Sequence, residues 1–213
     1  MKKLSVCILL FILCLFRIFA STSGNEYVKF GEKEIEYLKN CGVFSSSSLK
    51  GNFTQTKTVT SSGRKLESSG RVQIDPQRGI VWYTEKPYSS ILIVGSTNLV
   101  QKTGSGKPVR LDMSKNRIYT HIAQAMESIF FGDFSTMQKS FNCSFAAKNG
   151  TWNIRLKPKD KILSSFISEI TIEGNSQIKS LLLEEASADS ILYRFENLVP
   201  EELSSEETEI YNM

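Results

Sequence analysis

The sequence contains few of the residues that carry out catalysis or hold metal ions. His121 is its only histidine among 213 residues. No two cysteines have the spacing of a redox or zinc motif, and no serine lies in a Gly-x-Ser-x-Gly hydrolase turn. The stretch 104–107, Gly-Ser-Gly-Lys, lacks the earlier glycine of a phosphate-binding loop and precedes Pro108, so we interpret it as a flexible turn. The sequence therefore predicts no enzyme, no metal site and no cofactor.

Net positive charge is also low. The formal charge of +4 falls to +1 without Lys2, Lys3 and Arg17 of the N-terminal segment. Residues 201–213 hold five glutamates and no lysine or arginine, so we expect an acidic, flexible tail there. The rest is mildly basic, well short of the clustered Lys and Arg of a nucleic-acid binder. Length and composition predict one globular domain over residues 21–200.

Long apolar runs are absent after the N-terminus. Residues 4–16 form an uncharged run of 13 residues, too short to span a bilayer. Lys2 and Lys3 precede this run and Ala20 follows it, a pattern typical of a signal peptide over residues 1–20. An uncleaved membrane anchor is the alternative. We expect cleavage before Ser21 and export of a soluble chain, which leaves Cys41 and Cys143 either as one disulfide or as two buried thiols.

Short segments rich in Thr, Val, Ile and aromatic residues alternate with Gly, Pro, Asn and Asp. Their regular spacing and short connectors favour antiparallel strands rather than βαβ units. Helical spacing predicts a short helix over 32–41, capped by Gly42. The strands are predicted over 53–60, 66–74, 79–84, 90–94, 98–103, 109–112, 141–146, 151–157, 166–173, 177–185 and 190–196.

A second helix is predicted over residues 118–131. Ile122, Met126, Ile129 and Phe130 recur at three- and four-residue steps and give one strongly apolar face. This face either packs in an ordinary closed core or covers a groove that a ligand can enter. Met126, which is flexible, would adapt to ligands of variable shape.

Several ordered blocks resemble outer-membrane lipoprotein carrier proteins of the LolA family, in a divergent branch. They are Phe53-Thr54-Gln55, then 66–71 (Leu-Glu-Ser-Ser-Gly-Arg), then 76–87 with its Pro-Gln-Arg-Gly-x-x-Trp pattern. Blocks at 130–133, 152–158 and 170–174 are similar to later parts of the same family. The resemblance covers residues 32–197.

The resemblance implies an α+β fold, a curved antiparallel incomplete β-barrel with a helical lid that encloses an apolar cavity. It also implies a periplasmic carrier without a cofactor, which binds acyl chains of lipoproteins or related exported lipids. Such a carrier takes its cargo from an inner-membrane donor transporter to an outer-membrane acceptor, and we expect a monomer. The alternative is a periplasmic regulatory module that senses lipids or lipoproteins on the same fold.

Strand alternation pairs Ile80 with Trp82, Val72 with Ile74 and Leu92 with Val94 on shared faces. Which face points inward stays open, because Val81 and Tyr83 are apolar as well. The predicted acyl-binding residues are Phe53, Val72, Ile74, Ile80, Trp82, Leu92, Val94, Ile122, Met126, Ile129 and Phe130.

One position departs from the pattern of the family. Its members often have an arginine before the proline of the turn at 75–79, where it is implicated in holding or releasing cargo. This chain has Asp75 there, and the nearest basic residue is Arg78. A role for Asp75 or Arg78 in cargo release therefore stays open.

Overall fold

The computed structural model describes residues 26–43, 47–95, 98–112, 128 and 130–213. The predicted signal peptide and most of the second predicted helix lie outside these residues. Within them, twelve strands form a single sheet in which every neighbouring pair is antiparallel. The strands are β1 (Val28–Lys29), β2 (Leu49–Val59), β3 (Arg64–Asp75), β4 (Gly79–Lys86), β5 (Ser90–Val94), β6 (Asn98–Thr103), β7 (Val109–Asp112), β8 (Phe141–Lys148), β9 (Thr151–Pro158), β10 (Ile167–Gly174), β11 (Ile178–Glu185) and β12 (Ser190–Pro200).

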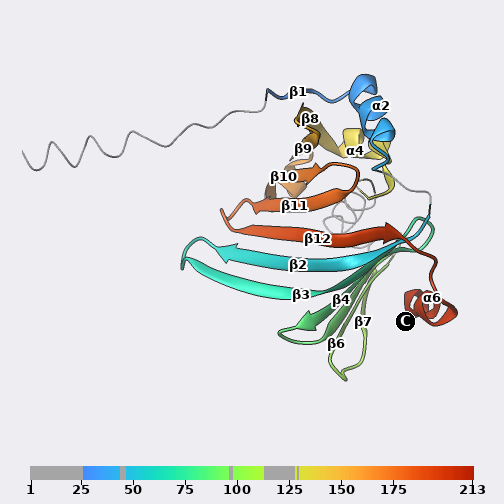
Figure 1. Cartoon of the computed structure of the whole chain (residues 1–213). Helices are drawn as coiled ribbons and strands as arrows, with labels where there is room; N and C mark the ends of the chain where they lie inside the picture. Colours follow the sequence, from blue (N-terminus) through green and yellow to red (C-terminus); the bar gives the residue numbers. More distant parts are fainter. Residues whose placement is uncertain (1–25, 44–46, 96–97, 113–127, 129) are drawn as a thin grey trace, which may run out of the picture.

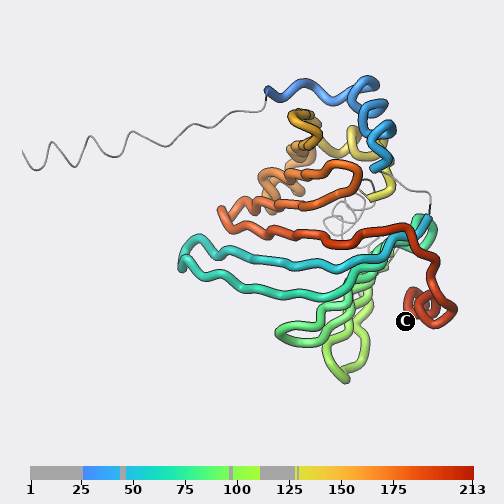
Figure 2. Tube along the Cα trace, in the orientation of Figure 1, coloured from blue at the N-terminus to red at the C-terminus, as the bar shows by residue number. Residues whose placement is uncertain are grey.

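The sheet is curved and open, which confirms the predicted incomplete barrel (Figure 1). Its strand order is β1-β8-β9-β10-β11-β12-β2-β3-β4-β5-β6-β7, so β1 and β7 are its two edges. Two antiparallel meanders, β8 to β12 and β2 to β7, are joined where β12 pairs with β2. Figure 2 shows the chain running back and forth through both meanders.

Short helices lie around the sheet. α2 (Glu32–Asn40) begins where the Glu34 carboxylate accepts the Gly31 N–H at 2.9 Å and ends before Gly42, whose φ of 69° suits a glycine cap. α4 (Phe134–Ser140) is capped by the Asp133 carboxylate. Both helices lie beside β8 and β9 in Figure 1. The others are α5 (Lys161–Ser164), α6 (Ser205–Glu209) and the 3-10 turn η2 (Ile210–Asn212).

The β3–β4 hairpin has a close backbone approach that requires glycine. A Cβ atom added to Gly70 would overlap the carbonyl oxygen of Tyr83, and one added to Gly79 would overlap that of Val94. Gly79 also has a φ of 105°, which other residues rarely adopt. These two glycines allow β3, β4 and β5 to approach closely at the two ends of the hairpin.

The inner face of the sheet carries the main core. The inner face is the face of the sheet that carries Phe53, Val72 and Trp82. Its apolar residues extend without a break from Phe145 on β8 to Val94 on β5 and belong to one buried cluster. The Phe30 ring, 5.3 Å from that of Phe134, and Leu38 of α2 add to this cluster. The curvature of the sheet therefore brings strands of both meanders around one apolar interior.

The outer face has a second, smaller cluster over β4, β5 and β6. Val81, Ile93 and Val100 are buried there by Ile210, Tyr211 and Met213 of the C-terminal segment. The predicted flexible tail thus forms α6 and η2 and packs on the sheet (Figure 2). The prediction of a flexible tail considered only the acidic composition. It did not consider the Ser204–Glu207 capping box or the apolar residues that follow it.

Candidate functional site

The inner face gathers the predicted site residues of the sheet. Strand pairing places Trp82 directly between Val72 and Leu92, and Ile80 between Ile74 and Val94. All of these except half-buried Leu92 are less than a tenth exposed. The sequence-predicted residues that meet in this one cluster are Phe53, Val72, Ile74, Ile80, Trp82, Leu92, Val94 and Phe130.

Four aromatic side chains form a closed circle of ring contacts within this cluster. Trp82 contacts Tyr193 at 6.4 Å and Phe130 at 6.5 Å between ring centroids. Phe195 closes the circle, 5.5 Å from Phe130 and 6.5 Å from Tyr193. Phe53 adds a fifth ring, 6.3 Å from Tyr193. Edge-to-face and offset contacts of this kind stabilise packing beyond area burial alone. The circle links β4 to β12 across β3 and β2, so it spans the junction of the two meanders.

The polar atoms in this aromatic circle are neutral. Burial raises the pKa of Tyr193 to about 12, so its hydroxyl stays protonated at physiological pH. The indole Nε1 of Trp82 is buried and has no hydrogen-bond partner among the described residues. No ion pair of the described chain involves a residue of the circle. The aromatic circle is therefore an uncharged, apolar environment.

Only one of the predicted lid residues lies within the described residues. Ile122, Met126 and Ile129 lie outside them, so their predicted role stays a prediction. Phe130 is helical and 1% exposed, and its ring meets those of Trp82 and Phe195 edge-on. The predicted helix thus contributes at least this side chain to the inner face.

Tyr193 and Phe195 are site residues that the sequence analysis missed. The strand that holds them was predicted over 190–196, but its faces were not assigned. Ile191, Tyr193 and Phe195 alternate along it with Leu192 and Arg194. The two aromatic residues on one face of this strand are the sequence signal that indicates its place in the site.

Asp75 holds the β3–β4 turn. Its carboxylate accepts hydrogen bonds from Ser48 Oγ, Gln77 N and Arg78 N, each at 2.9 Å, and from Arg78 Nη1 at 3.1 Å. Burial alone would raise the pKa of Asp75, but these hydrogen bonds and the Arg78 charge outweigh burial and lower it. Asp75 is thus a buried, ionised structural residue, while the Arg78 side chain is 41% exposed.

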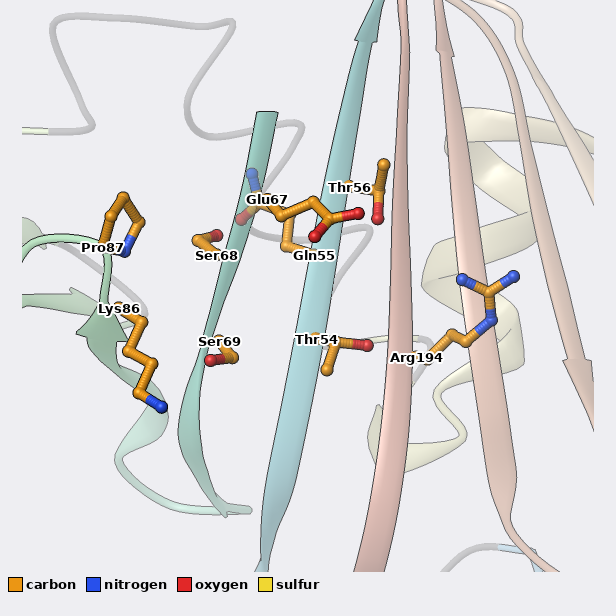
Figure 3. Close-up of a pocket in the computed structure, with 9 residues that line it drawn as sticks. All are labelled: Thr54, Gln55, Thr56, Glu67, Ser68, Ser69, Lys86, Pro87 and Arg194. Carbon is orange, nitrogen blue, oxygen red and sulfur yellow. The ribbon is translucent and has the colours of Figure 1, made fainter. Parts of the chain in front are cut away.

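A polar groove of about 460 Å³ crosses the outer face of β12, β2 and β3 (Figure 3). Figure 3 shows Lys86 and Arg194 on opposite sides of it, with Thr54 and Ser69 between them. Thr54 follows Phe53 on β2, so its side chain lies on the opposite face from the aromatic circle. The groove offers an acyl chain little apolar contact. Its lining residues are Thr54, Gln55, Thr56, Glu67, Ser68, Ser69, Lys86, Pro87 and Arg194.

Cys41 and Cys143 are both free thiols in the structure. Both are half-buried beside the main cluster, which matches the two-thiol alternative of the sequence analysis. Burial raises the pKa of Cys143 to about 11, and its Sγ lies 3.5 Å from the Phe141 carbonyl oxygen. Within the described part of the chain, no cluster of three His, Cys, Asp or Glu side chains is arranged to hold a metal ion. None of its helices is long and apolar enough to cross a membrane.

Comparison with known proteins gives a family match. The family model described as outer membrane lipoprotein carrier protein LolA matches residues 45–207. No curated protein matches the chain.

Solved structures with low sequence identity are also similar. A LolA superfamily protein from Nitrosomonas europaea is 10% identical, with a TM-score of 0.48, over 84% of this chain and 96% of that one. A putative outer membrane lipoprotein-sorting protein domain from Vibrio parahaemolyticus is 7% identical, with a TM-score of 0.44, over 84% and 97%. A DUF1329 family protein from Desulfovibrio piger is 9% identical, with a TM-score of 0.39, over 82% and 93%.

Proposed function

The chain belongs to the outer membrane lipoprotein carrier protein LolA family, and from this membership we propose that it is a periplasmic carrier of acylated cargo. It holds the acyl chains of a lipoprotein, or of a related exported lipid, against the inner face of the sheet. It then shuttles them from the inner to the outer membrane. The proposal assigns no chemical step to the protein.

One observation carries this proposal: the continuous apolar cluster of the inner face, whose aromatic circle carries no charge. Transfer of an acyl chain from water to such a surface gains about 0.8 kcal/mol for each buried methylene. Apolar contacts tolerate variation in chain length and position, so one surface can accept several cargoes. The predicted acyl contacts on the sheet are the cluster residues around Trp82, joined by Tyr193 and Phe195.

The proposal includes a donor and an acceptor at the two membranes. Because acyl chains have a high free energy in water, the carrier has to take cargo directly from an inner-membrane transporter and deliver it to an outer-membrane acceptor. We propose that the protein reaches this compartment through the signal peptide predicted over residues 1–20. N-terminal sequencing of the periplasmic fraction should then find a chain that begins near Ser21.

Acyl-probe binding tests the carrier proposal. Wild-type protein should bind a fluorescent fatty acid, and native protein from cells should carry copurified acyl lipid or lipoprotein in mass spectra. Phe130→Glu introduces a charge into the aromatic circle. If the circle borders a cavity for cargo, this variant should keep a cooperative thermal melt and lose probe binding.

Phe166→Glu provides the matched control, because Phe166 is 49% exposed and should tolerate the same charge in both assays. If Phe130→Glu loses folding and probe binding together, the aromatic circle is an ordinary closed core, since burial of an unpaired charge is costly. Absence of probe binding by the wild-type protein would overturn the carrier proposal without any variant.

A further inference from the structure

Trp82 has a buried hydrogen-bond donor that the described protein does not use. The side chain is 5% exposed, and its Nε1 is buried without an acceptor. Buried indole N–H groups usually have a partner, because an unpaired donor away from water costs free energy. The other tryptophan follows this rule: Trp152 Nε1 donates to the Asn175 carbonyl oxygen at 2.6 Å.

The surroundings of Trp82 do not explain why the position carries an indole. Its cross-strand neighbours are Val72 and Leu92, whose side chains contain no acceptor. Phe130 and Tyr193 pack against the Trp82 ring, and a phenylalanine ring could make contacts of the same kind without an unpaired donor. Among the described residues the Trp82 donor therefore has no acceptor, and a ligand that supplied one would remove the cost of the unpaired N–H.

The site limits the chemistry of that acceptor. A carboxylate or phosphate would bring a charge into a cluster whose described residues are apolar and include no cation to pair with it, which is costly. An uncharged carbonyl oxygen attached to an apolar body meets both requirements, because its chain fills the inner face while its oxygen accepts the N–H. Esters and amides at the head of an acyl chain have this structure.

We propose that Trp82 Nε1–H donates a hydrogen bond to the ester or amide carbonyl oxygen at the head of a bound acyl chain. This inference rests on the proposed carrier function and adds a positional restraint to it. Apolar contacts alone let a chain slide along the sheet, whereas one directed hydrogen bond fixes the depth of its carbonyl group.

Nuclear magnetic resonance of the mature chain with ¹⁵N-labelled indole tests the contact directly. The protein has two tryptophans and therefore two indole N–H signals. A long-chain fatty-acid methyl ester or the corresponding amide, delivered from cyclodextrin, should move the Trp82 signal downfield. The Trp152 signal should stay in place, because that donor is already paired. The alkane of equal length should not produce the downfield shift.

Trp82→Phe provides the second arm, since it keeps an aromatic ring and removes the donor. Affinity for the ester and the amide should fall about 2- to 12-fold, as the net free energy of a hydrogen bond implies. Affinity for the alkane should change little, because the alkane makes only ring contacts and the substitution keeps an aromatic ring. The preference of the protein for ester over alkane should therefore disappear.

The outcomes separate this inference from the carrier proposal. If the wild-type protein binds ester and alkane equally and the Trp82 signal shows no downfield shift, the hydrogen bond is absent and the carrier proposal stands. The same conclusion follows if Trp82→Phe keeps the preference for ester. If the wild-type protein binds neither probe, the carrier proposal fails and this inference fails with it. If Trp82→Phe does not fold, the indole signals of the wild-type protein decide.

Discussion

Lys50 on β2 donates hydrogen bonds to Glu207 on α6 at 2.9 Å, although 157 positions separate them in the chain. Lys50 also pairs with Glu201 at 2.8 Å, and Glu207 accepts a hydrogen bond from Gln73 at 2.7 Å. The contact fastens the C-terminal segment to the outer face. Ile210, Tyr211 and Met213 can then cover the apolar residues of β4 to β6.

This ion pair makes stability depend on pH. Burial alone would raise the pKa of Glu207, but hydrogen bonds from Lys50 and Ser204 outweigh it and lower the pKa below its ordinary value of 4.5. A carboxyl group with a lower pKa in the folded than in the unfolded state contributes stability that is fully present above the unfolded-state pKa. This stability is lost as the pH falls through the folded-state pKa. Glu207→Gln should therefore lower the free energy of unfolding by about 1 kcal/mol at pH 7.

Urea unfolding at several pH values checks this expectation. The difference between wild type and Glu207→Gln should begin to shrink as pH falls below about 4.5, where the unfolded chain binds a proton first, and should vanish below the lower folded-state pKa. Glu206→Gln makes the same charge change on an exposed side chain and should shift stability by less than about 0.5 kcal/mol. A pH-independent difference for Glu207→Gln would contradict the role of the charge.

Removal of the hydroxyl group from either of two tyrosines of the outer cluster should change the stability of the protein in opposite directions. Tyr211 Oη is buried without a partner in the described chain, so Tyr211→Phe should raise stability by about 1 kcal/mol. Tyr83 Oη donates to Gln73 Oε1 at 2.8 Å, and Gln73 is 3% exposed. Tyr83→Phe should therefore lower stability by about 1 kcal/mol. Thermal melts of the two variants suffice, and equal losses would show that Tyr211 has a partner.

Asp75 should affect stability more than cargo release. Asp75→Ala leaves the backbone N–H groups of Gln77 and Arg78 and the Arg78 guanidinium without their shared acceptor. We expect a loss of about 3 kcal/mol, against about 1 kcal/mol for Arg78→Ala, whose side chain is partly exposed. Chemical denaturation measures both values. An Asp75→Ala protein of wild-type stability that binds cargo but fails to release it would overturn the structural role.

The two cysteines should label as free thiols. Denatured, unreduced protein should react at both Cys41 and Cys143, whereas a disulfide would leave neither reactive. In native protein at pH 8, a pKa of about 11 leaves roughly a thousandth of Cys143 as thiolate, so alkylation there should be slow. Unfolding should remove this protection. Mass spectrometry of alkylated peptides distinguishes the two positions, and fast native labelling of Cys143 would contradict its burial.

Turn residues and alternation predicted most of the sheet. The bounds predicted for β5, β6 and β7 agree with the structure, because Pro87, Gly95 and Gly104 with its neighbours interrupt short runs of strand-forming residues. β1 was not predicted because two residues are too few to show alternation. α4 was not predicted either, since its polar sequence stands directly after another predicted helix.

The inward face of β4 could not be predicted for a physical reason. Alternation is informative only when one face of a strand meets water. Trp82 on the inner face and Val81 on the outer face are both buried, the latter by Ile210 and Tyr211. The segment that buries the outer face lies more than a hundred residues further along the chain. It was expected to be a flexible tail, so local pattern gave no sign that it returns to the sheet.

An open sheet leaves two strand edges with unpaired backbone groups, which can recruit other chains and start aggregation. Here the two edge strands are short: β1 has two residues and pairs with only Ser144 and Phe145 of β8, and β7 has four residues. Lys107 and Pro108 precede β7, and Arg110 on it donates to the Asn212 carbonyl oxygen at 3.2 Å. Short edges beside lysine and proline discourage the pairing of one molecule with another. The open sheet should therefore have little tendency to extend from one copy of the protein to the next.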